Sequence, residues 1–301
     1  MSTDFIDATG QGRNGFWRYL GGLLTVLVFW LVFGAVPLLL GAIWAQVDRD
    51  PATALDPSTG TLTGIDPILG AYLLPNLSFP IFLLGIVVAV RLFHGRGVRT
   101  LVTPRPSIRW RRVWAGFGLW LLLAAVAAGV EIALYPAGFS WRNVSLGRYL
   151  GFVVLALILT PIQTSTEELF FRGYLLQATG RIVRVRWVLA LINGVLFAAP
   201  HYLNPEVARD PVLLMLYYGG LGTFFAWLTL RDGTAELALG AHAANNLFVV
   251  LLINYEGSAL QTPALVHSTR LDPAYNLITF AASTVAFAFV ALRKRTREAP
   301  G

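Results

Sequence analysis

A small set of charged, imidazole and amide side chains lies inside long apolar stretches of this sequence. An ionisable group within a membrane helix costs several kcal/mol unless it is paired or faces a wet cavity. Such residues are therefore the first candidates for a functional site. In chain order they are Glu131, Glu167, Glu168, Arg172, His201, His242, Asn245 and Asn246.

The spacing of these residues indicates how they pair. Glu168 and Arg172 are four residues apart, so on a helix they share one face and form an ion pair. Glu167 points about 100° away from Glu168 and is free to face a cavity. His242 and Asn246 also lie four apart and present an imidazole beside an amide. A carboxylate, imidazoles and an amide are the groups that activate water and stabilise an oxyanion.

The composition excludes a water-soluble single domain. Hydrophobic residues make up 56% of the 301 residues, charged residues only 13%, and the mean hydropathy is +0.63; the charged share is about half that of a soluble domain. There is no cysteine, which excludes a disulfide scaffold, a thiolate metal site and a cysteine nucleophile. The net charge of +7 comes from basic residues between the apolar runs, so we expect membrane lipid and no nucleic acid as a partner.

The apolar runs predict an all-α, polytopic membrane protein with about eight transmembrane helices. Basic residues alternate between the intervening segments: they fill segment 96–112 and the tail, where Lys294, Arg295 and Arg297 lie, whereas the first loop has only Arg49 among four aspartates. This alternation places both termini in the cytoplasm. We expect one multi-pass domain, residues 1–301, in a cell membrane. The predicted spans are 15–46, 67–93, 113–135, 149–178, 187–202, 211–230, 237–254 and 275–292.

The polar residues of three predicted spans fall at one depth. Glu168 lies 13 residues before Arg181, and His201 lies 15 after Arg186; His242 and Asn246 lie 11 and 15 after Arg231. At about 1.5 Å per helical residue, these distances correspond to roughly 16–23 Å from the cytoplasmic face, if the helices are straight and untilted. We therefore expect the three spans to bring their polar groups together.

The motifs resemble those of a known protease family. Residues 166–173, Thr-Glu-Glu-Leu-Phe-Phe-Arg-Gly, contain an EExxxR motif; Phe197 to His201 gives FxxxH; and His242 to Asn246 gives HxxxN. In this order, and covering a core of about 149–254, they resemble the CPBP (CAAX prenyl protease and bacteriocin-processing, or ABI) family of intramembrane proteases.

The resemblance implies an endopeptidase whose cavity opens to the cytoplasmic side. It implies that Glu167 is the general base that activates water and that His201 helps to hold that water. His242 and Asn246 would stabilise the tetrahedral oxyanion, with Glu168 and Arg172 as a supporting ion pair. It further implies a peptide or lipidated-protein substrate, such as a prenylated C-terminal tail or a bacteriocin leader.

The residues leave the cofactor open between none and zinc. Glu167, His201 and His242 supply the three protein ligands of a catalytic zinc, and the family has been called metalloprotease-like. However, the HExxH helix that would make zinc the default is absent. We therefore slightly favour water activation without a metal.

Other interpretations of the same residues are a proton-coupled transporter and a catalytically silent immunity or scaffold protein. Intramembrane acids mark proton relays as well as proteases, but the sequence shows no internal repeat of the kind common in transporters. A silent protein would be favoured by a replaced motif residue, and every motif residue is present. Glu131 matches no motif, and we expect it in helix packing or at a cavity edge.

Overall fold

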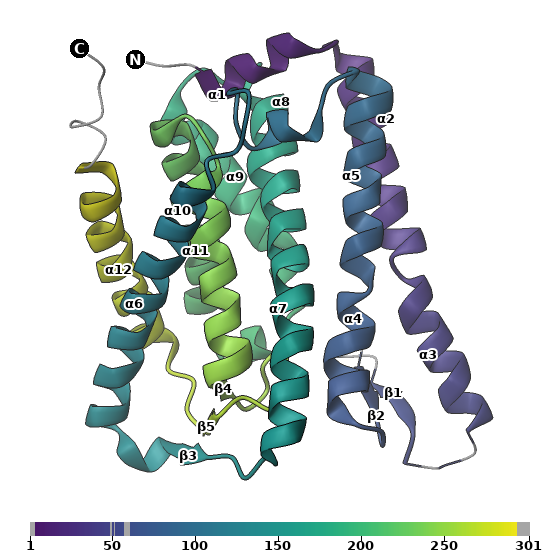
Figure 1. The fold of residues 1–301 in the computed structure, drawn as a ribbon, viewed down its shortest axis with the longest axis vertical. Coiled ribbons are helices and arrows are strands. Elements are labelled where there is room, and N and C mark those ends of the chain that lie inside the picture. The colour runs from purple at the N-terminus through teal and green to yellow at the C-terminus, as the bar shows by residue number, and fades with distance from the viewer. Residues whose placement is uncertain (1–3, 49, 51, 57–60, 294–301) are drawn as a thin grey trace.

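A computed structural model of the chain describes residues 4–48, 50, 52–56 and 61–293. Helices dominate the fold, with a few short strands at one end (Figure 1). The main helices are α1 (Asp4–Asp7), α2 (Phe16–Leu27), α3 (Val36–Val47), α4 (Leu74–Asn76), α5 (Ser78–His94), α6 (Trp110–Leu134), α7 (Leu146–Glu168), α8 (Leu176–Gly180), α9 (Arg186–His201), α10 (Pro211–Asp232), α11 (Glu236–Leu247) and α12 (Pro273–Arg293). The chain is an all-α polytopic membrane protein, as its sequence predicts.

Each of the eight predicted spans is helical, but they differ in length. Six continuous helical stretches are long and apolar enough to cross a membrane: Phe16–Val47, Ile68–His94, Trp110–Leu134, Leu146–Gly180, Pro211–Asp232 and Pro273–Arg293. The other two, α9 with 16 residues and the shorter apolar helix Glu236–Leu252, are the ones that carry His201 and His242. A 16-residue helix rises only about 24 Å, less than the hydrocarbon thickness, so α9 ends inside the depth of the bundle.

Three of the long stretches include π-helical turns, at Val28–Phe33, Ile68–Leu73 and Leu169–Leu175, and the shorter helix Glu236–Leu252 ends in one at Phe248–Leu252. The strands are minor. β1 (Ala54–Asp56) pairs antiparallel with β2 (Thr61–Thr63), and β5 (Val266–Ser268) lies between β3 (Phe139–Trp141) and β4 (Ile253–Tyr255). Both small sheets lie at the lower end of the bundle in Figure 1, which we call the strand end.

The described ends of the chain lie together. Helix α1 and the last turn of α12 are both at the upper end of the bundle in Figure 1, opposite the strand end. The segment that connects α5 to α6 and the one that connects α8 to α9 also lie there; we call this the arginine-rich end. Arg49, Lys294, Arg295 and Arg297, which the charge pattern also uses, lie outside the described residues.

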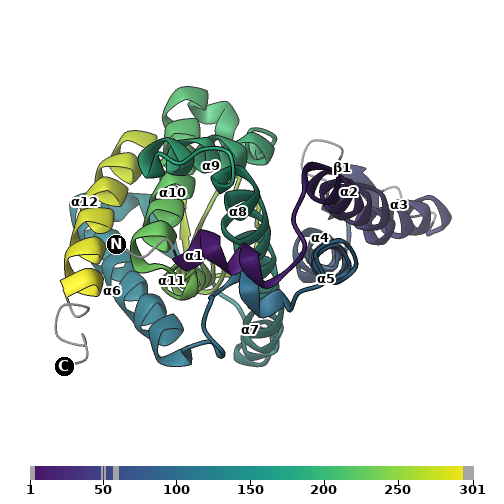
Figure 2. The ribbon, with the colours of Figure 1, turned by 90° about the horizontal axis from the view of Figure 1, so that it is seen from above.

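The motif helices sit in the main bundle. Seen from above, α6, α9, α10, α11 and α12 group together, and α7 lies between this group and the helices α2, α3 and α5 (Figure 2). Helix α11 packs closely against α6 and also contacts α7. The largest buried cluster contains Trp120, Phe171, Phe197 and Phe225, so aromatic rings surround the polar residues of the motifs.

Candidate active site

The three motifs meet at one cavity of about 480 Å³. Its lining includes Glu167 from α7, His201 from α9, and His242 with Asn246 from α11. Glu168 and Arg172 do not line it and are fully buried behind it. The structure therefore brings together all six residues to which the family resemblance assigns a role, in two layers: four groups facing the cavity and a buried ion pair behind them.

The acidic pair stands where α7 changes from α-helix to π-helix. Helix α7 ends at Glu168, and the π-helix Leu169–Leu175, which we call η6, continues it through Arg172. Such wide turns are rare and are frequently found at functional sites. Glu167 is 8% exposed and Glu168 is 0% exposed, so only the first carboxylate reaches the cavity.

The buried Glu168 carboxylate binds two partners at once. His242 donates its Nδ1–H to Glu168 Oε1 at 2.7 Å, and Arg172 Nη1 lies 3.2 Å from the same oxygen. The Arg172 guanidinium also stacks over the Phe197 ring, 4.2 Å from its centroid. Because Nδ1 of His242 is held in this way, its Nε2 is the nitrogen that faces the other carboxylate, Glu167.

Glu167 and His242 face each other without a direct hydrogen bond. His242 Nε2 lies 3.7 Å from Glu167 Oε2, which is too long for a direct N–H···O bond. Because both groups line the cavity, both can contact one and the same group that enters it. When both of its ring nitrogens carry a proton, His242 can donate from Nε2 as well as from Nδ1.

His201 is held with one ring nitrogen free for the cavity. Its Nδ1 lies 2.7 Å from the carbonyl oxygen of Phe197, one helical turn earlier. A carbonyl only accepts, so Nδ1 carries the proton, and Nε2 of the neutral ring is left as an acceptor. The ring also packs against Tyr218 of α10, with centroids 4.4 Å apart and the two rings tilted by 31°. Tyr218 in turn donates its hydroxyl to Glu206 Oε1 at 2.6 Å.

Asn245 and Asn246 have different roles. Trp120 of α6 donates its indole N–H to Asn245 Oδ1 at 3.2 Å, and Asn245 Nδ2 donates to Asn246 Oδ1, also at 3.2 Å. This chain fixes the orientation of the Asn246 amide and leaves its Nδ2 available as a donor. The geometry thus favours Asn246 as the residue that hydrogen-bonds to a ligand and Asn245 as the residue that orients it.

Comparison with known proteins identifies the chain. Residues 146–248 match the model of the Rce1-like family, described as type II CAAX prenyl endopeptidase Rce1-like. Over 283 residues the chain is 35% identical to "Uncharacterized protein YyaK" of Bacillus subtilis (strain 168), covering 94% of this chain and 93% of that protein. The chain belongs to the CPBP family of CAAX proteases. No solved structure matches it significantly. At the level of the family, it is a CAAX-type intramembrane protease.

The CAAX-protease match begins at the first residue of α7 and includes all three motifs. It does not include α6, yet α6 supplies Trp120 to the site. Gly240 of α11 permits this close packing: a Cβ there would lie 1.9 Å from the carbonyl oxygen of Val113 in α6. The helix that carries His242 and Asn246 is therefore pressed directly against the α6 backbone.

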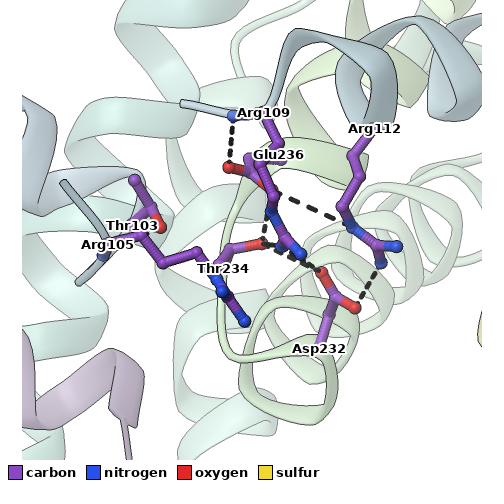
Figure 3. Close-up of polar contacts among 7 residues, drawn as sticks. All are labelled: Thr103, Arg105, Arg109, Arg112, Asp232, Thr234 and Glu236. Carbon is purple, nitrogen blue, oxygen red and sulfur yellow. Dashed lines mark hydrogen bonds and ion pairs between the residues drawn. The ribbon is translucent and has the colours of Figure 1, made fainter. Parts of the chain in front are cut away.

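An ion-pair cluster fixes the start of α11 in this CAAX-protease fold. We call it the arginine clamp; it consists of Arg109, Arg112, Asp232, Thr234 and Glu236 (Figure 3). Arg109 donates its backbone N–H and its Nε–H to the two oxygens of Glu236, both at 2.8 Å, and Arg112 pairs with Asp232. The clamp thus ties the first turn of α6 to the short α10–α11 turn.

Two further acidic residues that line the cavity, Glu206 and Glu131, belong to none of the sequence motifs. Glu206, in the segment between α9 and α10, is 3% exposed and accepts hydrogen bonds from Tyr218 and from the backbone N–H of Ala259. Burial, together with this carboxylate, raises the pKa of Tyr255 above its usual range. Glu131 lines the cavity edge, 4.0 Å from Arg270 Nε, which agrees with one of the two placements expected for it. No spacing rule connects Glu206 to the motifs, so only the fold reveals it.

The side chains offer no ready set of metal ligands. Among the described residues, no three His, Asp or Glu side chains are grouped closely enough to hold a metal ion. The two histidines each have Nδ1 engaged, His242 by Glu168 and His201 by a carbonyl group, which leaves Nε2 of each ring available as in many zinc sites, so the grouping of the side chains decides the point. As they stand, these residues do not form the three-ligand site that a catalytic zinc requires.

Proposed function

We propose that this protein is an intramembrane endopeptidase in which Glu167 activates a water molecule for attack on a peptide bond. The observation that carries the proposal is the position of His242 between two carboxylates: Glu168 holds its Nδ1, and its Nε2 faces Glu167 across 3.7 Å. A carboxylate that can accept a proton and an imidazole that can donate a hydrogen bond thus line the same cavity. A transporter relay would not require the Trp120-supported amide of Asn246 beside them.

The first step is the attack of water. The Glu167 carboxylate accepts one proton from water, and the resulting hydroxide adds to the carbonyl carbon of the scissile peptide bond. His201 accepts a hydrogen bond from this water at its free Nε2. The carbonyl oxygen becomes an oxyanion, which His242 Nε2–H and Asn246 Nδ2–H stabilise.

The second step is the release of the amine. The protonated Glu167 gives its proton to the peptide nitrogen, the carbon–nitrogen bond breaks, and the products are a carboxylic acid and an amine. Glu168 and Arg172 take no part in the proton transfers. They hold His242 in its orientation and balance the charge behind it. None of these steps uses a metal, and metal analysis of freshly purified protein tests that choice.

The proposed substrate is a membrane-associated peptide segment. Aromatic side chains, among them Trp30, Phe79 and Phe82, line the cavity together with the polar site. Such a mixed lining suits a chain that has one apolar part in lipid and one hydrated scissile bond. A prenylated tail and a leader peptide both satisfy this description.

Cleavage by the purified protein in liposomes tests the proposal. Glu167→Ala and His201→Ala should each abolish cleavage of a membrane-anchored peptide while leaving thermal unfolding nearly unchanged. Glu256→Ala is the matched control, because Glu256 is exposed and does not line the cavity. Continued cleavage by the two site variants would overturn the proposal, and so would a wild-type protein that only moves solutes across vesicles.

A further inference from the structure

We infer that the cavity receives its substrate from the extracytoplasmic side of the membrane, at the strand end. This inference rests on the proposed function for the reaction itself and adds the substrate class. The substrate would be a membrane-anchored peptide whose cleaved segment lies outside the cytoplasm. A cytosolic C-terminal tail, which the family resemblance suggests, would not reach the site.

The cavity extends from the motifs toward the strand end. Beyond the catalytic groups, its lining includes Ser258 and Leu260 after β4, Ser268 of β5, Arg270 before α12, and Asn276 in the first turns of α12. Strands β4 and β5, which border or contain several of these residues, lie at the strand end (Figure 1). None of the described residues in segments 95–109, 181–185 and 233–235, at the opposite end, lines it.

The arginine-rich end is closed above the site. Fully buried Glu168 and Arg172 form the layer directly behind the cavity. Beyond them, the arginine clamp joins α6 to the α10–α11 turn through Glu236, which is also 0% exposed (Figure 3). A peptide from that end would have to break these buried ion pairs and leave their charges unpaired inside the protein, which is strongly unfavourable.

The charge distribution gives the orientation of the two ends. Of the described arginines outside the core of the membrane, only Arg142, Arg148, Arg209 and Arg270 lie toward the strand end. Because basic residues are retained on the cytoplasmic side, the other end is cytoplasmic and the strand end faces outward. The arginines of the other end are Arg13, Arg18, Arg91, Arg96, Arg99, Arg105, Arg109, Arg111, Arg112, Arg181, Arg184, Arg186, Arg231 and Arg293.

Cysteine labelling in intact cells tests the side of access, because the sequence contains no cysteine of its own. Three single variants of the full chain suffice: Ser140→Cys on exposed β3, Ala259→Cys in the cavity, and Ser107→Cys, exposed at the arginine-rich end. A membrane-impermeant maleimide should label the first two in intact cells and the third only after permeabilisation. Labelling of Ala259→Cys only after permeabilisation would overturn the inference.

Cleavage of two reporters separates this inference from the proposed function. Both carry the same single membrane span and the same cleavable segment, placed outside the cytoplasm in one reporter and inside it in the other. Wild-type cells should cut only the outer reporter, and Glu167→Ala cells should cut neither. Cutting of only the inner reporter refutes the side of access but keeps the protease. If wild type cuts neither reporter, the proposed function and the substrate class fail together, and labelling still decides the side of access.

Discussion

Replacement of Glu168 by glutamine should separate the buried charge balance from the hydrogen bond that orients His242. Glu168 Oε1 serves both His242 Nδ1, at 2.7 Å, and Arg172 Nη1, at 3.2 Å, and neither Glu168 nor Arg172 has any exposed side-chain surface. In Glu168→Gln, Arg172 becomes an unpaired buried cation, so we expect the free energy of unfolding to fall by about 3–5 kcal/mol. The Arg172–Phe197 stacking is present in both proteins and compensates for none of this loss.

The same change should weaken catalysis by a smaller amount. The glutamine oxygen still accepts from His242 Nδ1, so the ring keeps its orientation. The bond is no longer charge-assisted, and the difference is about 1–1.5 kcal/mol. If that loss falls on the transition state, in which His242 donates to the oxyanion, kcat/KM should fall about 10-fold. Reversible denaturant unfolding followed by tryptophan fluorescence and peptide cleavage measure the two effects on one preparation.

The double variant Glu168→Gln/Arg172→Met provides the control. It removes both charges and keeps a side chain of similar length, so the stability should return to within about 1 kcal/mol of wild type. Its kcat/KM should remain low, because the charge behind His242 is still missing. The reasoning is refuted if Glu168→Gln is as stable as wild type, or if the double variant is no more stable than the single one.

Three further predictions concern the support of the site. Trp120→Phe removes the N–H that holds Asn245, a hydrogen bond of about 1 kcal/mol. We expect kcat/KM to fall about fivefold with little change in stability. The fall in kcat/KM should vanish when the same change is made in an Asn245→Ala background. Gly240→Ala places a Cβ against an α6 carbonyl and should lower the free energy of unfolding by about 1–3 kcal/mol. Gly118→Ala, with open space around it, should be neutral or stabilising. Equal free energies of unfolding for the two variants would contradict the close contact at Gly240. The backbone N–H donors of the first turn of α12 lower the pKa of Asp272 below its usual 3.8, so its stabilising effect is present above that pH and is lost as the pH falls through the lowered value; thermal unfolding against pH should show this loss in wild type and not in Asp272→Asn.

The sequence predicts the residues of the site better than the contacts among them. Glu167, His201, His242 and Asn246 could be selected because polar groups in apolar helices stand out, and helical spacing places them at one depth. The i, i+4 spacing also predicts the Glu168–Arg172 pair. The same spacing cannot reveal that Glu168 binds His242, because that contact joins residues 74 positions apart, on two helices.

Other features depend on packing that no local pattern encodes. The π-helix Leu169–Leu175 lies in an apolar run that reads as ordinary α-helix, and only tertiary contacts decide the wider turn. Trp120 looks like one of many apolar residues of α6, and its hydrogen bond to Asn245 requires the close approach at Gly240. Two of the eight predicted spans, α9 and the helix Glu236–Leu252, are shorter than the other six, and these two carry His201 and His242.

The most direct test of the central claim is cleavage by purified Glu167→Gln protein compared with wild type in the same liposomes, in heavy-oxygen water. We predict that the wild-type product carries one heavy oxygen in its new carboxylate. We also predict that Glu167→Gln, equally stable, cuts at least about 100-fold more slowly, because it lacks the base that takes the proton from water. Wild-type cleavage rates in the folded Glu167→Gln variant would contradict the account.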